Sequence, residues 1–148
     1  MARKMGAVRV AAPILLLALA LGGCGGGGGK GVVGGRVPEC VDAVRHKELS
    51  SRFPGEFPLP EGTVVGSEYL DRGARVAELF IRGDLDSARE YYREQLPKRG
   101  FDLGEGEAEE EEAETEFDGH GFEGRLKLHT IRGCDEALSL AVVLRPRS

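Results

Sequence analysis

Residues 112–130 read EAETEFDGHGFEGRLKLHT, and this stretch decides the fold. On either side of its glycines, charged residues alternate with apolar or small ones, a period of two that is typical of a half-buried β-strand. Folding the stretch about residues 119–121 places three acidic residues opposite three basic ones: Glu116 opposite Arg125, Glu114 opposite Lys127, and Glu112 opposite His129. Opposite charges directly across a hairpin favour that register. We therefore predict an antiparallel hairpin whose apolar side chains share the other face.

The residues around this hairpin predict one helix and one more strand. Residues 137–144 have the same period of two and predict a last strand, in which four apolar side chains share one side: Leu138, Leu140, Val142 and Leu144. Residues 84–99 carry an apolar stripe at steps of three and four, with Asp84 suited to the N-cap and Gly100 placed just after the last turn, which together indicate a helix. Residues 105–111 are rich in glutamate, and we expect a solvated loop there.

The first half of the domain predicts a second hairpin and a proline-rich arm. Residues 63–69 and 75–82 have a strand pattern and flank a turn signal at 71–73. The prolines in residues 53–60 exclude a regular helix or a central strand, so we expect Phe53, Phe57 and Leu59 to lie across the core as an extended arm. The fold expected is α+β: one helix packed on an antiparallel sheet of about five strands, in the order ββαβββ.

The N-terminus has the layout of an export signal. Basic residues occur at positions 3, 4 and 9, and an apolar run over residues 10–21 follows. This run is shorter than the roughly 20 residues that span a bilayer. It ends Leu21-Gly22-Gly23-Cys24.

That ending resembles the lipobox of bacterial lipoproteins. The resemblance implies that a peptidase cuts between Gly23 and Cys24 and that the Cys24 thiol takes a diacylglyceryl group. It also implies attachment to the cell membrane by lipid, on the extracytoplasmic face. The resulting organisation is a signal peptide at 1–23, a lipidated cysteine and glycine-rich tether at 24–35, and a small α+β domain at 36–148. A membrane-spanning anchor helix and an ordinary secretory signal remain alternatives.

The domain is also similar to small envelope lipoproteins of high-GC bacteria that have no assigned activity. The similarity consists of an aspartate-capped helix with a tyrosine pair, a glycine after its last turn, a Phe-x-Gly-x-Gly turn and a late cysteine. In this chain these features are Tyr91-Tyr92, Leu96 to Gly100, Phe117 to Gly121, and Cys134.

The cysteine count then predicts a disulfide. With Cys24 lipidated, Cys40 and Cys134 remain as an even pair in an oxidising compartment. We predict a Cys40–Cys134 disulfide; two free buried thiols or a catalytic thiol are the alternatives. The acidic neighbours Asp135 and Glu136 disfavour a reactive thiolate at Cys134.

The net charge and the spacing of the histidines disfavour several classes of function. Three of the 20 basic residues and none of the 25 acidic residues precede Cys24, which leaves 17 against 25, a balance of −8 that disfavours nucleic-acid binding. The histidines, His46, His120 and His129, lie in no metal-type spacing. We expect no catalytic residues, metal site or cofactor.

The expected function is therefore a non-catalytic binding or envelope-support module whose protein partner the sequence does not identify. One alternative is a carrier of a small ligand or divalent cation that uses the acidic residues 105–112. Another is an envelope enzyme.

Overall fold

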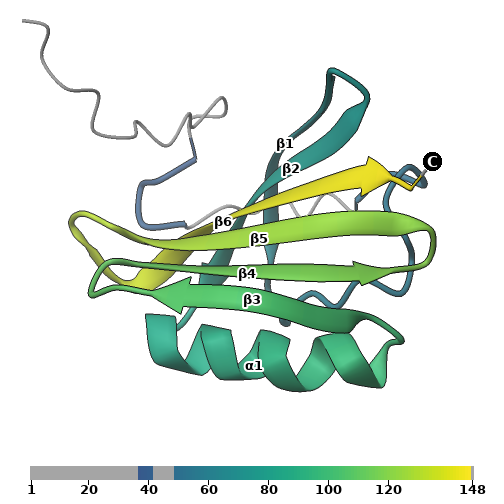
Figure 1. The fold of residues 1–148 in the computed structure, drawn as a ribbon. Helices are drawn as coiled ribbons and strands as arrows, with labels where there is room; N and C mark the ends of the chain where they lie inside the picture. The colour runs from purple at the N-terminus through teal and green to yellow at the C-terminus, as the bar shows by residue number, and fades with distance from the viewer. Residues whose placement is uncertain (1–36, 42–48, 148) are drawn as a thin grey trace, which may run out of the picture. The chain divides into compact units, whose positions relative to one another are not determined.

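The computed structural model describes residues 37–41 and 49–147, which lie within the unit Val32–Ser148. These residues form one antiparallel sheet of six strands and one helix (Figure 1). The elements in chain order are β1 (Val64–Asp71), β2 (Ala74–Arg82), α1 (Leu85–Lys98), β3 (Asp102–Ala108), β4 (Glu112–Gly119), β5 (Phe122–Ile131) and β6 (Cys134–Pro146).

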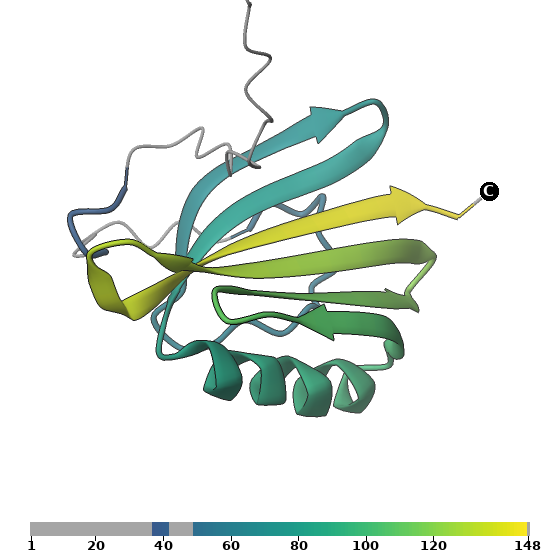
Figure 2. The same cartoon turned by 60° about the vertical axis from the view of Figure 1, so that its left-hand side comes forward.

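The spatial order of the strands is β1-β2-β6-β5-β4-β3. Helix α1 connects β2 to β3, which is the last strand at the far side of the sheet, and it packs on the face of β3, β4 and β5 (Figure 2). The chain then returns strand by strand until β6 pairs with β2. This order makes β6 an interior strand and leaves β1 and β3 at the two ends of the sheet order.

The class α+β is confirmed, but the expected strand count and order are wrong. The described residues form six strands in the order ββαββββ rather than about five in the order ββαβββ. The additional strand is β3, which occupies part of the stretch expected to be a solvated loop. All seven of its residues are exposed, so it contributes no side chain to the core and carries no hydrophobic pattern that a sequence could reveal.

The hairpin formed by β4 and β5 has the predicted register. Glu112 pairs with His129, Glu114 with Lys127 and Glu116 with Arg125. The two turn residues, His120 and Gly121, have φ of 51° and 81°. Positive φ at both positions is the geometry of the type I′ turn, whose twist matches that of the paired strands.

The first hairpin is also confirmed, with β1 paired to β2 across the turn at Arg72 and Gly73. It contains an irregularity between Val65 and Ser67 that the sequence pattern did not predict. A Cβ atom at Gly66 would lie 2.8 Å from the Phe80 ring. Glycine at this position therefore lets β1 pass close to a large side chain of β2.

Helix α1 begins and ends where its capping residues predict. The Asp84 carboxylate accepts a hydrogen bond from the Ser87 backbone N–H at 2.9 Å. This bond is the main reason that the pKa of Asp84 is lowered from its ordinary value. Gly100 follows the helix with a φ of 82°, as expected for the residue after the C-cap.

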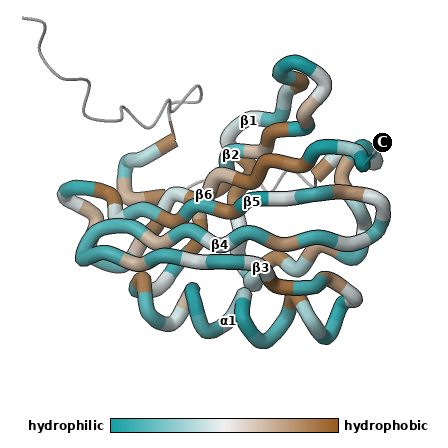
Figure 3. The backbone as a smooth tube through the Cα atoms, viewed as in Figure 1, coloured by the Kyte–Doolittle hydropathy of each residue, from teal (hydrophilic) through white to brown (hydrophobic). Residues whose placement is uncertain are grey.

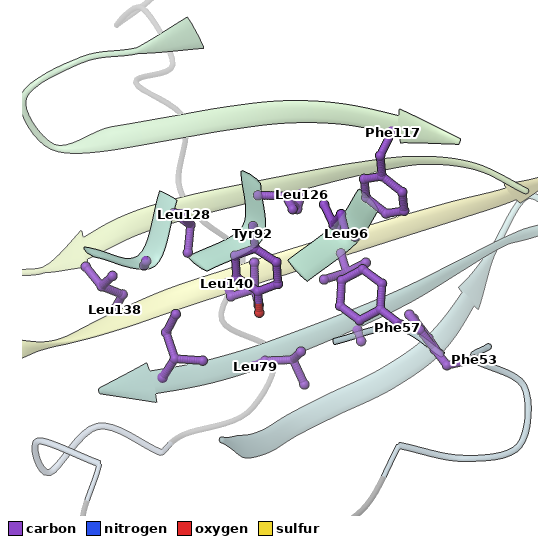
Figure 4. Close-up of a cluster of buried hydrophobic side chains, with 14 of the residues drawn as sticks. Phe53, Phe57, Leu79, Tyr92, Leu96, Phe117, Leu126, Leu128, Leu138 and Leu140 are labelled. Atoms are coloured by element: carbon purple, nitrogen blue, oxygen red, sulfur yellow. The ribbon is translucent and has the colours of Figure 1, made fainter. Parts of the chain in front are cut away.

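The main core lies between the sheet and a layer formed by α1 and the arm (Figure 4). The helix contributes Ala88, Tyr92 and Leu96. The sheet contributes the side chains of alternate residues, and in β6 these are the four predicted to share one side: Leu138, Leu140, Val142 and Leu144. Each of these β6 side chains is at most 2% exposed, so β6 supplies the centre of the core.

The predicted arm, residues 53–60, lies within a longer irregular segment, residues 49–63, which buries the predicted aromatic residues but is not extended. Phe53 and Phe57 are 4% and 5% exposed, and Leu59 packs against the core. The backbone instead forms successive tight turns, in which Phe53, Phe57 and Thr63 each donate a hydrogen bond to the carbonyl three residues earlier. The expectation of an extended arm is therefore wrong.

A second apolar cluster lies apart from the main core. It consists of Val41, Val64, Phe80, Cys134 and Ala137, with Val37 and Ile131 packed against it. Phe80 alternates along β2 with Leu79 and Ile81, which belong to the main core, so this cluster lies on the opposite face of the sheet. Residues 37–41 therefore pack on the face that α1 leaves open.

Candidate binding surface

The open face of β4 and β5 carries a ladder of opposite charges. Arg125 lies 2.6 Å from the Glu116 carboxylate and 3.2 Å from that of Glu114. Lys127 lies 3.0 Å from Glu112 and 3.9 Å from Glu114. The basic side chains therefore contact acidic partners both directly across the hairpin and diagonally.

These contacts change the acidity of the groups involved. The hydrogen bond from Lys127 is the largest influence that lowers the pKa of Glu112. The hydrogen bond to Glu116 is the largest influence that raises the pKa of Arg125. Both shifts favour the charged forms, so the carboxylates of β4 are neutralised by the cations of β5.

Strand β3 adds a second acidic strand beside the first. In the β3–β4 pairing, Glu107 is opposite Glu114 and Asp102 is opposite Asp118. Like charges directly opposite each other destabilise a strand pair. The pairing of β3 therefore depends on its backbone hydrogen bonds with β4, against the preference of its side chains.

The side chains of β3 lack the cationic partners that β4 has. Among the described residues, Asp102, Glu105 and Glu107 form no ion pair, and neither do the glutamates 109–111 of the β3–β4 turn. Figure 3 shows this turn in the hydrophilic colour, in contrast to the hydrophobic middle of β6. The end of the sheet at β3 is therefore a row of exposed, unneutralised carboxylates.

A shallow hollow separates β3 from the helix. It has a volume of about 210 Å³, and its lining includes Arg89 and Arg93 of α1 together with Leu103, Gly104 and Gly106 of β3. The pairing of β3 shifts between Leu103 and Gly106. A Cβ atom at Gly106 would lie 2.9 Å from a backbone carbonyl oxygen of β4. Glycine is therefore needed here for the close approach, and it also leaves this part of the strand without side-chain cover.

The structure brings the two predicted disulfide residues together. The Cys40 thiol donates a hydrogen bond to the Gly133 carbonyl oxygen at 3.2 Å, and its hydrogen bond with the Cys134 side chain raises the pKa of Cys40. Both residues are free thiols, so the Cys40–Cys134 disulfide stays a prediction. Cys40 and Val41 have left-handed φ values of 45° and 57°, which are unfavourable for a β-branched residue such as Val41.

The two described histidines make structural contacts far apart in the sheet. His120 lies in the β4–β5 turn, where its Nε2 is 2.8 Å from the Arg99 carbonyl oxygen at the end of α1. Its ring packs 4.6 Å from the Phe101 ring. His129 lies towards the other end of β5, with its Nδ1 3.3 Å from the Glu112 carboxylate. His46 lies outside the described residues.

The remaining sequence-predicted sites also lie outside the described residues. These are the signal peptide 1–23, the cleavage point between Gly23 and Cys24, the lipidation site Cys24 and the tether 24–35. In the described part of the chain, no helix is both long and apolar enough to span a membrane. The same part contains no group of three or more His, Cys, Asp or Glu side chains that could hold a metal ion.

Sequence reasoning missed the exposed acidic strand as a surface feature. The glutamates themselves were evident, but their assignment to a loop hid the fact that Asp102 and Glu107 share a face with the acidic residues of β4. The only local signal was the spacing of Leu103 and Ala108 on either side of two glycines, which is too weak to predict a strand.

Comparison of the chain with protein-family models, with curated proteins and with solved structures finds no match.

Proposed function

We propose that this chain is a lipid-anchored protein on the extracytoplasmic face of the cell membrane, and that its domain binds a partner protein without catalysing a reaction. The anchor is supported by the basic residues, apolar run and Leu21-Gly22-Gly23-Cys24 ending of the N-terminus. Each buried methylene of an acyl chain contributes about 0.8 kcal/mol to membrane binding. Two or three chains on Cys24 would hold the protein at the membrane almost permanently.

The observation that carries the binding role is the contrast between the two acidic strands. The carboxylates of β4 have cationic partners on β5, whereas those of β3 are exposed and form no ion pair among the described residues. Uncompensated charge of one sign on an exposed strand favours association with a surface of opposite sign. The proposed partner therefore presents positive charge to the β3 side of the sheet.

The non-catalytic character is supported by the contacts of the reactive side chains. His120 contacts the carbonyl group of Arg99 at the end of the helix, and His129 is paired with Glu112 on the charged ladder. A general base must lie within hydrogen-bond reach of the proton that it removes. Among the described residues, the contacts of these two imidazoles are with backbone or carboxylate oxygens, and neither contacts a serine or cysteine side chain.

The membrane anchor is tested by the intact mass of the protein extracted from membranes. We expect a chain that begins at Cys24 and carries acyl groups, and we expect Cys24→Ser to leave the protein outside the membrane fraction. Mass measured with and without reductant reports the disulfide in the same sample. Native protein that still carries Met1, or an unmodified thiol at position 24, would contradict the anchor.

The binding role is tested by photo-crosslinking in intact cells. A photoreactive residue at position 105 reports on β3, and one at position 94, on the exposed side of α1, is the matched control because both replace an exposed glutamate. We expect one protein to be crosslinked from position 105 and not from position 94, with the yield falling as salt is added. Identical products from both positions would contradict a role for the β3 side of the sheet.

A further inference from the structure

In the described sheet, the order of the strands leaves the open side of β3 without a neighbouring strand of opposite charge. The basic residues of β5 neutralise the acidic residues of β4, whereas β3 has acidic β4 on one side and, within residues 37–41 and 49–147, no strand on the other. We propose that β3 accepts an extended basic segment of the partner protein as a seventh strand. This inference rests on the proposed function, because it gives the mode by which the partner binds.

The backbone of β3 is available for this pairing. Every side chain of the strand is exposed, and β3 pairs only with β4 in the described sheet. The last strand of a sheet presents a row of unpaired N–H and C=O groups that can pair with an added strand. Gly104 and Gly106 place no side chain in the way, and the hollow towards α1 leaves room beside them.

The side chains of β3 specify an alternating partner sequence. Asp102 and Glu107 pair with Asp118 and Glu114, so they lie on the charged open face. An added strand would therefore carry lysine or arginine at every second position. Leu103 pairs with Phe117 and Ala108 with Ala113, which lie on the helix side, so small or apolar residues fit the positions between.

Charges on a terminal strand also have a simpler use, since natural sheets employ them to prevent aggregation. That use requires only that strands in general are repelled. The inference requires selectivity: basic strands are accepted and acidic strands are refused. Protection against aggregation and acceptance of a basic strand therefore predict different binding of basic and acidic peptides.

The test measures peptide binding to the full-length processed protein in vesicles of zwitterionic lipid. The probe is a seven-residue peptide that alternates lysine and valine, and its control alternates glutamate and valine. Two further probes carry N-methyl groups on all the lysines or on all the valines, because each set removes the donors from one edge of the peptide only. We expect the lysine–valine peptide to bind, the glutamate–valine peptide not to bind, and exactly one of the methylated peptides to lose binding.

Variants locate the site. In Asp102→Lys/Glu107→Lys, the new side chains would face Asp118 and Glu114, so the strand itself is expected to remain paired. We expect this variant to bind the lysine–valine peptide at least about tenfold more weakly, as for the loss of close charge pairs. The control Glu109→Lys/Glu110→Lys makes the same charge change in the neighbouring turn and should change binding by less than about threefold, as expected for rim charges.

Two results would overturn the inference. If both methylated peptides bind like the parent, or if both fail, binding does not use one edge of an added strand. If the variant in β3 and the control in the turn weaken binding equally, the attraction is a general effect of charge. Either result leaves the anchoring and crosslinking tests intact, so failure of this binding mode is distinguishable from failure of the proposed function.

Discussion

At the scale of the residue, the hydroxyl of Tyr92 is the one buried side-chain polar group in the described part of the chain that lacks a hydrogen-bond partner. Tyr92 is 1% exposed. Figure 4 shows the hydroxyl directed away from α1 into the apolar core. Burial raises the pKa of Tyr92, because the charged form would be even less favourable there. A buried hydroxyl without a partner costs about 1–3 kcal/mol.

We therefore predict that Tyr92→Phe stabilises the protein by about 1 kcal/mol, because it removes the unpaired group and keeps the ring. Tyr92→Ala should destabilise it by about 3–5 kcal/mol, through loss of packing against Phe57. The measurement is denaturant unfolding, with Tyr91→Phe as the control because Tyr91 is only partly buried. A loss of stability in Tyr92→Phe would mean that the hydroxyl has a hydrogen-bond partner, such as a buried water molecule.

At the scale of the element, the N-terminus of α1 is capped by one carboxylate, that of Asp84. The Asp84 carboxylate accepts hydrogen bonds from both the backbone N–H and the hydroxyl of Ser87. The pKa of Asp84 is lower in the folded protein than in the unfolded chain, so the stabilisation is present above the unfolded pKa. It is lost as the pH falls through the folded value.

We predict that Asp84→Ala lowers the urea midpoint at neutral pH, and that the difference from wild type shrinks as the pH falls through the native pKa of Asp84. Asp84→Asn should lose less, because asparagine also accepts a hydrogen bond at an N-cap. Unfolding curves recorded across the acid range check this. A difference that is independent of pH would contradict the assignment of the cap to the carboxylate.

Strand β3 differs from the other strands in having no buried side chain. Its backbone hydrogen bonds are opposed by the pairs Glu107–Glu114 and Asp102–Asp118. Segments with few buried apolar contacts open locally at low free-energy cost. We predict that β3 amides exchange hydrogen faster than those of β6, and that Glu107→Lys slows this exchange. Glu90→Lys on the exposed side of α1 is the control; equal protection of β3 and β6 would contradict the argument.

The β4–β5 hairpin could be predicted from the sequence, whereas β3 and the turns of the arm could not. The β4–β5 register followed from two independent patterns, because apolar alternation and opposite charges agree on the same pairing. Strand β3 could not be predicted in the same way, since its position depends on backbone pairing and on the crossover made by α1. The turns of the arm were missed because proline and glycine exclude regular structure without specifying which turns replace it.

The candidate surface was predictable only in part. The acidic residues were evident from the sequence, and so was the pairing of Glu112, Glu114 and Glu116 with cations. The residues that lack cationic partners, Asp102 and Glu107, could be identified only after the strand order placed β3 at the end of the sheet. The order of the strands in the sheet therefore decides which carboxylates lie beside a basic strand and which do not.

At the scale of the whole molecule, the cysteine pair brings residues 37–41 into contact with the start of β6. Cys40 and Cys134 are in contact, and cross-linking residues so far apart in sequence restricts the unfolded chain strongly. We predict that reductant lowers the melting temperature of the oxidised protein by several degrees, and that Cys40→Ser/Cys134→Ser melts like the reduced form. An unchanged melting temperature, with no mass difference on reduction, would contradict the disulfide.

The rate at which the predicted Cys40–Cys134 disulfide forms should increase with pH. Because the pKa of Cys40 is raised, less of its thiolate is present at neutral pH than for an ordinary cysteine. The thiolate is the form that attacks a disulfide oxidant. We therefore expect the oxidation rate in a glutathione buffer to rise steeply with pH into the alkaline range.

The position of Cys134 has a mechanical consequence. It is the first residue of β6, which is hydrogen-bonded to β2 on one side and to β5 on the other. With the Cys40–Cys134 bond formed, tension on the anchor would enter the domain at this doubly flanked strand and bypass the arm and the first hairpin. If the anchor and the partner contact of the proposed function both hold, a pulling force between them would act on the two hydrogen-bonded ladders that join β6 to β2 and to β5.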